Sequence, residues 1–202
     1  MMRLYKNGLY FLFAIIILIS CRSKERYVPE TKIAKTVPLN FVRNSDNKFS
    51  PHNDTMYYGG HFFTGFQYSL YKSGDTEFVR SYFNGVEEGP QRSWYENKQQ
   101  NELRFYINGK KEGVQEGWWP NGKKRFIFIA QSDAYTGELK EWNMKGFLYK
   151  VFHYTNGNEE GSQRLWWEDG TVRANYVIRN GKRYGLLGIK LCSNPYDSIT
   201  KK

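Results

Sequence analysis

The sequence predicts an all-β fold, a single elongated antiparallel meander of about five hairpin repeats, each 24 residues long. Three observations support this prediction: glycines recur every 24 residues, aromatic residues make up 18% of the chain, and Asn-Gly pairs recur between the expected strands. Aromatic residues favour strands, and Asn-Gly is a strong hairpin signal because type I′ turns require positive φ at both central residues.

Registered columns of residues define the repeat. The first column consists of Gly65, Gly89, Gly113, Gly137, Gly161 and Gly185. Five residues after a glycine stand Trp94, Trp118, Trp142 and Trp166. The next position holds a second set of aromatic residues, Tyr71, Tyr95, Trp119 and Trp167. Two residues after a glycine stand Gln91, Gln115 and Gln163. Self-similarity at a fixed period indicates that one structural unit is repeated.

Two-residue turns at both ends of each hairpin would fix the register of the strands. They pair Leu70 with Glu77 and Val79 with Pro90, and they place Gly89 opposite Arg80 and likewise each later column glycine opposite a large side chain. Large side chains over strand glycines pin sheet register, so we expect each glycine to make room for its neighbour.

The same register divides the residues between two faces of the sheet. The first tryptophan column shares one face with an aliphatic row, Val79, Leu103, Ile127 and Val151. The second aromatic column shares the other face with the glutamines. A single-layer sheet must shield both faces, so the second column is interpreted either as shielding or as a binding stripe. The candidate binding residues are Tyr71, Tyr95, Trp119, Trp167, Gln91, Gln115 and Gln163.

The N-terminus carries the features of an export signal. Arg3 and Lys6 precede an apolar run from Leu9 to Ile19, which is shorter than the roughly 20 residues that span a bilayer as a helix. The run ends in "LISC", Leu18 to Cys21, which resembles a bacterial lipobox. That resemblance implies cleavage before Cys21 and diacylation of its thiol. Cys192 then has no partner for an internal disulfide and is interpreted as a small packed residue.

These features divide the chain into four parts. We expect a lipoprotein signal peptide at 1–20, a tether and irregular lead-in at 21–55, the repeat domain at 56–192 and a C-terminal tail at 193–202. The lead-in is predicted to be irregular because it lacks periodicity and contains several prolines and turn formers.

The repeat units resemble MORN repeats, and more closely the bacterial variant in proteins labelled YwqK-family antitoxins. The resemblance rests on the Asn-Gly-Lys turn, the glycine-led strand, the aromatic pair and the second glycine turn, and it covers Tyr57 to about Lys190. It implies an elongated scaffold for protein contacts. Lys98, Asp133 and Asn143 depart from the pattern, so local irregularity is expected there.

Enzymatic and nucleic-acid functions are disfavoured. The net charge of +10 falls to +8 when Arg3 and Lys6 are removed, and the basic residues are spread along the repeats without forming a stripe. His52, His61 and His153 lack metal-ligand spacing, and no nucleophile elbow or phosphate-binding loop is present. We expect no enzyme activity, no metal and no cofactor.

The sequence therefore predicts a lipid-anchored scaffold of the cell envelope that holds another envelope protein. In a Gram-negative source, Arg22 after the lipidated cysteine favours the outer membrane. Two alternatives remain open: a binder of glycan or anionic lipid headgroups, and an antitoxin of a toxin–antitoxin system.

Overall fold

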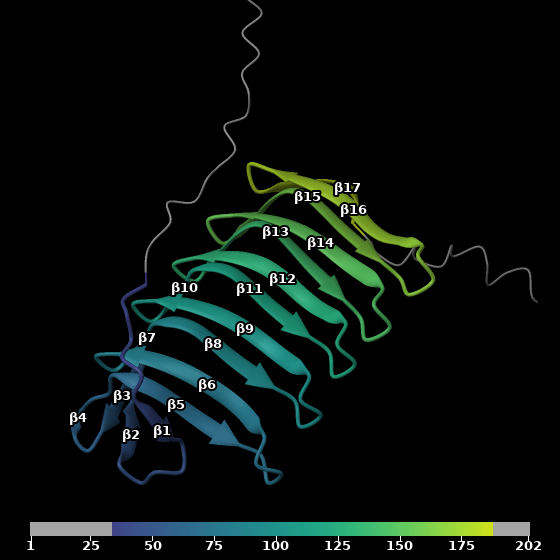
Figure 1. Ribbon diagram of the computed structural model, residues 1–202. Helices are drawn as coiled ribbons and strands as arrows, with labels where there is room; N and C mark the ends of the chain where they lie inside the picture. The colour runs from purple at the N-terminus through teal and green to yellow at the C-terminus, as the bar shows by residue number, and fades with distance from the viewer. Residues whose placement is uncertain (1–33, 188–202) are drawn as a thin grey trace, which may run out of the picture. The chain divides into compact units, whose positions relative to one another are not determined.

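The computed structural model describes residues 34–187, and every regular element in that range is a β-strand (Figure 1). The segments predicted as signal peptide and C-terminal tail, together with Cys21 and Cys192, lie outside the described residues. A 14-stranded, mostly antiparallel sheet is accompanied by a separate sheet of three short strands. The small sheet consists of β2 (Phe49–His52), β3 (Thr55–Tyr58) and β4 (His61–Phe62).

The strands of the large sheet follow one another in chain order. Its members are β1 (Phe41–Arg43), β5 (Gly65–Leu70), β6 (Thr76–Phe83), β7 (Val86–Glu87), β8 (Gly89–Trp94), β9 (Gln100–Ile107), β10 (Lys110–Lys111), β11 (Gly113–Trp118), β12 (Lys124–Gln131), β13 (Ala134–Trp142), β14 (Leu148–Thr155), β15 (Asn158–Trp166), β16 (Val172–Arg179) and β17 (Lys182–Leu186). Each first strand begins at or just before a column glycine. The all-β, largely antiparallel prediction is therefore confirmed.

Turn conformation persists where the sequence departs from the repeat. In the turn between β6 and β7, Asn84 and Gly85 have φ of 49° and 80°, as a type I′ turn requires. Ser132 and Asp133 replace Asn-Gly between β12 and β13, yet they adopt nearly the same φ values, 50° and 71°. Lys98, which replaces a turn glycine, also has positive φ, 67°. The irregularity expected at Lys98 and Asp133 is thus absent from the backbone.

Asn121-Gly122 does not form the type I′ turn that its sequence suggests. Gly122 has φ of 82°, but Asn121 is not among the residues with positive φ. The turn is closed instead by the Gly122 N–H donating to Trp119 O at 2.8 Å and the Trp119 N–H donating to Lys123 O at 2.8 Å. A longer loop therefore joins the two strands of this hairpin.

The predicted register is correct over most of the first hairpin, but Leu70 pairs with Thr76 and not with the predicted Glu77. Between hairpins the register differs from the prediction up to β15, whereas β16 and β17 keep the predicted alignment, with Tyr176 opposite Gly185. Within the first hairpin Tyr68 pairs with Val79, which is the expected alignment. Between hairpins Val79 pairs with Arg92, two residues beyond the predicted Pro90. The turn itself has the expected alignment, with Phe83 opposite Val86, so the two extra residues are inserted as a bulge after it. A shift of two keeps every side chain on its predicted face.

The four column glycines from Gly89 to Gly161 serve backbone conformation, which corrects the prediction that they make room for large neighbours. At Gly185, by contrast, a Cβ would lie only 2.7 Å from Asn175 O. Gly113 has φ of 72°, and a Cβ built there would meet nothing within 4 Å. Gly161 has φ of 82°, and its nearest neighbour would be His153 Cβ at 3.8 Å. Space is available at both positions, but the left-handed conformation is costly for residues with a Cβ. The bulges therefore require glycine.

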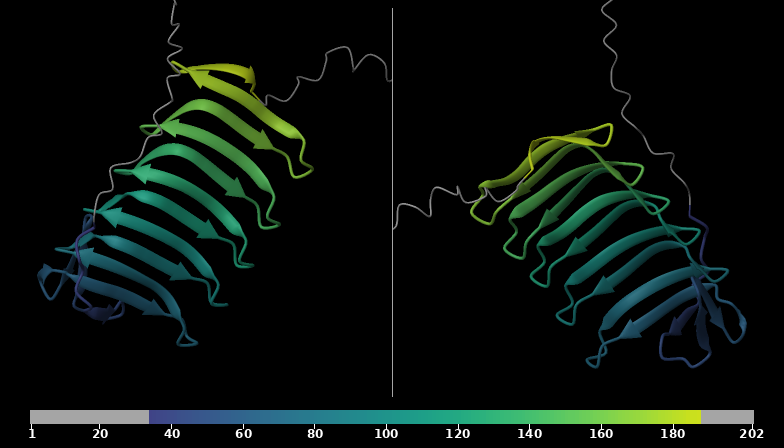
Figure 2. Two further views of the ribbon diagram at one scale, coloured as in Figure 1. Left: turned by 45° about the horizontal axis from the view of Figure 1, so that its top comes forward. Right: turned by 180° about the vertical axis from the view of Figure 1, so that it is seen from behind.

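Burial differs between the two faces of the large sheet. We call the side that carries Gln91, Gln115, Leu139 and Gln163 the glutamine face, and the side that carries Trp94, Trp118, Trp142 and Trp166 the tryptophan face. The buried apolar clusters lie on the glutamine face, with members Phe128, Ala130, Leu139, Ala174, Tyr176 and Ile178. The four tryptophans are only half-buried. From β8 to β16 no second layer of described elements covers the sheet (Figure 2).

The region predicted as irregular lead-in contains ordered structure from residue 41 onward. Strand β1 pairs in parallel with β5, and Phe41 stacks on Phe66 at 4.8 Å. Phe63, 2% exposed, packs against the rings of Phe49 and Tyr82. Residues 41–63 therefore cap the first hairpin. Sequence periodicity could not reveal this cap because its strands are only two to four residues long.

Candidate binding faces

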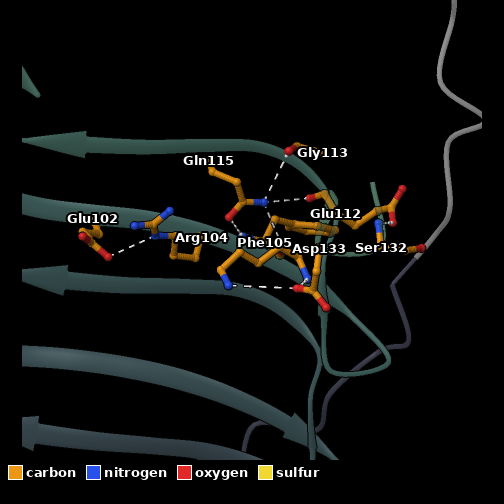
Figure 3. A network of polar contacts seen from close by, with 9 residues as sticks. Glu102, Arg104, Phe105, Glu112, Gly113, Gln115, Ser132 and Asp133 are labelled. Atoms are coloured by element: carbon orange, nitrogen blue, oxygen red, sulfur yellow. Dashed lines mark hydrogen bonds and ion pairs between the residues drawn. The ribbon is translucent and has the colours of Figure 1, made fainter. Parts of the chain in front are cut away.

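The glutamines of the candidate binding face are buried inside the sheet. Gln115 and Gln163 are both 0% exposed. Gln115 accepts the Phe105 N–H at 3.3 Å and donates to the carbonyls of Phe105 and Glu112, both at 3.1 Å (Figure 3). The amide thus supplies the hydrogen bonds that the bulge removes from the strand ladder.

Gln163 repeats the arrangement one strand pair further along. Its Oε1 accepts the His153 N–H at 3.1 Å, and its Nε2 donates to His153 O at 2.8 Å. Gln91, 6% exposed, lies at the same position of the second hairpin. Since these side chains are inaccessible to a partner, the glutamines do not belong to an exposed binding surface.

The second aromatic column forms a ladder between hairpins. The Tyr71 hydroxyl donates to Trp94 O at 2.7 Å and the Tyr95 hydroxyl donates to Trp118 O at 3.0 Å. The Trp119 Nε1–H donates to Trp142 O at 2.9 Å. Each polar tip therefore satisfies the carbonyl of the residue 23 positions ahead. This contact explains why a tyrosine or tryptophan, and not phenylalanine, occupies the column.

Trp167 is the exception among the aromatic candidates. It is 52% exposed, and the Arg173 guanidinium lies 4.6 Å from the centre of its ring. Of the predicted binding residues, it presents the largest exposed fraction. The structure thus separates the predicted face into buried glutamines, three aromatic residues in the ladder and one exposed tryptophan.

At the other end of the strands, hydrogen bonds between turns also join successive hairpins. The backbone N–H of Gly109 donates to Glu87 O at 2.8 Å, and that of Gly157 donates to Tyr135 O at 2.9 Å. The Glu88 carboxylate is fully buried and accepts the N–H groups of Asn108, at 2.8 Å, and of Lys35, at 2.9 Å. Successive hairpins are therefore hydrogen-bonded at both ends of their strands.

The tryptophan face presents an apolar row flanked by ion pairs. The Lys124 ammonium lies 4.1 Å from the ring centre of Trp118 and 2.7 Å from the Glu116 carboxylate. Lys140 and Glu138 form a second pair at 2.5 Å. This face combines half-buried aromatic rings with charges that are largely compensated.

A polar hollow of about 600 Å³ is a site that the sequence interpretation missed. It lies over β6, β8 and β9, and its lining includes Arg80, Glu87, Asn101, Arg104 and Tyr106. The hollow could have been predicted by comparing the residues at the same position of successive repeats. Arg80 and Arg104 occupy a column in which the later hairpins carry Phe128, Phe152 and Tyr176.

Burial shifts the acid–base properties of groups in this hollow. It raises the pKa of the Glu87 carboxyl, an effect that the positive charge of Arg80 partly offsets. Burial, with the nearby Glu87 carboxylate, also raises the pKa of Tyr106 to about 12. Tyr106 is therefore a neutral hydroxyl at physiological pH. The hollow thus contains fixed cations together with neutral and anionic groups that accept hydrogen bonds.

Comparison of the chain with protein-family models and with curated proteins finds no significant match. Within residues 34–187 no helix is long and apolar enough to cross a membrane. The described part of the chain also contains no group of three or more His, Cys, Asp or Glu residues placed to hold a metal ion.

Proposed function

We propose that the chain is a lipoprotein of the cell envelope whose sheet, an array of about five MORN-like hairpins, holds a protein partner through its tryptophan face. The observation that carries this proposal is the row Trp94, Trp118, Trp142 and Trp166, half-buried at the same position of consecutive hairpins. Extended apolar surface on a soluble sheet is a feature of interaction sites, and tryptophan is enriched where interfaces gain most binding energy.

The hydrogen bonds that join successive hairpins at both ends of their strands support the scaffold role. Because each hairpin is joined to the next at both ends, the tryptophans are held at a regular spacing. Rings that are already ordered lose less side-chain entropy when a partner binds. The predicted binding face is revised accordingly, because Tyr71, Tyr95 and Trp119 are engaged in the ladder and the glutamines are buried.

Membrane attachment through Cys21 is part of the proposal and rests on the sequence. Arg3, Lys6, the short apolar run and "LISC" support export and acylation. Within the cell envelope, attachment would raise the local concentration of the sheet near a membrane-bound partner.

The experiment combines lipid labelling with site-specific crosslinking in the source organism. We expect Cys21→Ser to abolish incorporation of labelled palmitate and to release the protein from membranes. A photoreactive residue at Trp118 or Trp142 should yield one discrete protein adduct, whereas the same residue at exposed Lys110, on the opposite turn, should not. Equal adducts at Lys110 and Trp118 would contradict the tryptophan face as the docking surface.

A further inference from the structure

The polar hollow lies where the repeat departs from its own packing pattern. In later hairpins the column that contains Arg80 and Arg104 is aromatic, and Phe128 packs against Tyr135 with ring centres 4.7 Å apart. Phe152 similarly contacts Tyr176 at 6.3 Å. These rings fill the glutamine face in its C-terminal half. Two neighbouring arginines at the equivalent positions leave a charged hollow in its N-terminal half.

Arg80 and Arg92 are cations of the hollow that form no ion pair among the described residues, and Arg80 lies in the column that is aromatic in later hairpins. The Arg80 guanidinium lies 4.4 Å from the ring centre of Phe78, and among the described residues no carboxylate lies within ion-pair distance of it. Arg104, by contrast, is already paired with the Glu102 carboxylate at 3.0 Å. The Arg80 side chain is also exposed, so an anion can reach its planar guanidinium group.

The same hollow contains acceptors that would repel a purely anionic ligand. Glu87 contributes a half-buried carboxyl, and Glu77 a carboxylate that accepts one bond, from the Ser69 hydroxyl at 2.7 Å. The fitting ligand therefore carries hydroxyl donors as well as a negative charge.

Backbone pairing disfavours an extended peptide as that ligand. Strands β6, β8 and β9 lie in the interior of the sheet and pair with neighbours on both sides. Peptides that add to sheets use the free N–H and C=O groups of an edge strand. Recognition here must use side chains, and the aromatic rings of Phe78 and Tyr106 add flat apolar walls. Sugar rings offer hydroxyls that both donate and accept, together with apolar faces.

We propose that this hollow binds an acidic saccharide, with Arg80 receiving the sugar carboxylate and with Glu87 accepting sugar hydroxyls. The hollow lies on the glutamine face, and of the tryptophan row only Trp94 lines it. The two proposals are tested at different residues, so either can fail without the other. A volume of about 600 Å³ is within the range of ligand sites, roughly 300 to 1,000 Å³.

Calorimetric titration of the mature, lipidated protein in detergent micelles with tetragalacturonate tests the site. Arg80→Gln should weaken binding by about tenfold or more, because a hydrogen bond to a charged group is lost. Arg164→Gln removes an exposed arginine from the tryptophan face and should leave the affinity unchanged. Neutral maltotetraose, of equal length, should bind at least about tenfold more weakly than tetragalacturonate.

Three results would overturn the proposal. The first is no detectable binding of tetragalacturonate, and the second is equal weakening by Arg80→Gln and Arg164→Gln, which indicates non-specific charge attraction. The third is a hexaglutamate peptide that binds as tightly as tetragalacturonate with the same dependence on Arg80, which indicates an acidic peptide site. Near-UV circular dichroism checks folding, and Arg80→Lys, which keeps the charge but loses the planar fork, should bind with intermediate affinity.

Discussion

At the residue scale, the column glycines and the buried glutamines act together. A glycine at positive φ lets the strand bulge, and the amide two residues later supplies the bonds that the bulge removes, as at Gly113 and Gln115. Leu139 shows that the amide is not obligatory, since an apolar side chain fills the same position after Gly137. The spacing of glycine and glutamine is therefore explained by backbone geometry.

Substitution of Gly113 tests whether conformation or space matters there. We expect Gly113→Ala to lower the free energy of unfolding by about 1–2 kcal/mol, because φ of 72° is unfavourable for a residue with a Cβ. Gly113→Asn should cost less, since asparagine tolerates the left-handed region. Urea denaturation measures both. If alanine and asparagine destabilise equally, a steric cause at this site is indicated instead.

At the element scale, the ladder of aromatic side chains holds neighbouring hairpins in register. Pairing between hairpins is shorter than pairing within them: β6 and β8 share two residue pairs, whereas β8 and β9 share six. Side-chain bonds at one end and turn bonds at the other therefore contribute to the junction. The last rung of the ladder runs from Trp119 to Trp142, since the next hairpin has Asn143 in this column.

Tyr95→Phe removes one rung of the ladder while keeping the ring. We expect the free energy of unfolding to fall by about 1 kcal/mol, because Trp118 O loses the hydroxyl donor. Tyr184→Phe is the control, since Tyr184 is exposed on β17. Thermal unfolding compares the variants. Equal thermal unfolding midpoints for wild type and Tyr95→Phe would contradict this prediction and would show that water replaces the hydroxyl donor without loss of stability.

At the scale of the whole molecule, the N-terminal segment of the chain pairs with β5, the first strand of the first hairpin. An unpaired edge strand invites association with other chains. Strand β1 pairs with β5, and the small sheet encloses Phe63 against the first hairpin. The cap therefore contributes to solubility as well as to stability.

Adjacent phenylalanines allow a matched test of the cap. Phe63→Ala should destabilise the protein by about 3–5 kcal/mol, because the removed ring is buried among aromatic neighbours. Phe62→Ala should cost under about 1 kcal/mol, since Phe62 is 59% exposed. Denaturant midpoints and light scattering are the measurements. Comparable losses from both variants would mean that the cap does not depend on Phe63.

The alternation of strands and turns and the composition of each face follow from the amino-acid sequence alone. Period and parity are local properties, and a register shift of two residues leaves parity unchanged. The C-terminal hairpins therefore follow the predicted pattern closely. Lys98 and Asp133 depart from the repeat sequence without the predicted structural irregularity, because both adopt the positive φ of the glycines that they replace.

The tertiary structure decided which face is buried, which residues are accessible and how the first hairpin is capped. Burial depends on packing between side chains of neighbouring hairpins, and no single repeat specifies it. Gln115 and Gln163 are polar in sequence yet fully buried, because each amide both donates to and accepts from backbone groups that the bulge beside it leaves unpaired. The hollow at Arg80 likewise exists only because two arginines from successive hairpins meet on one face.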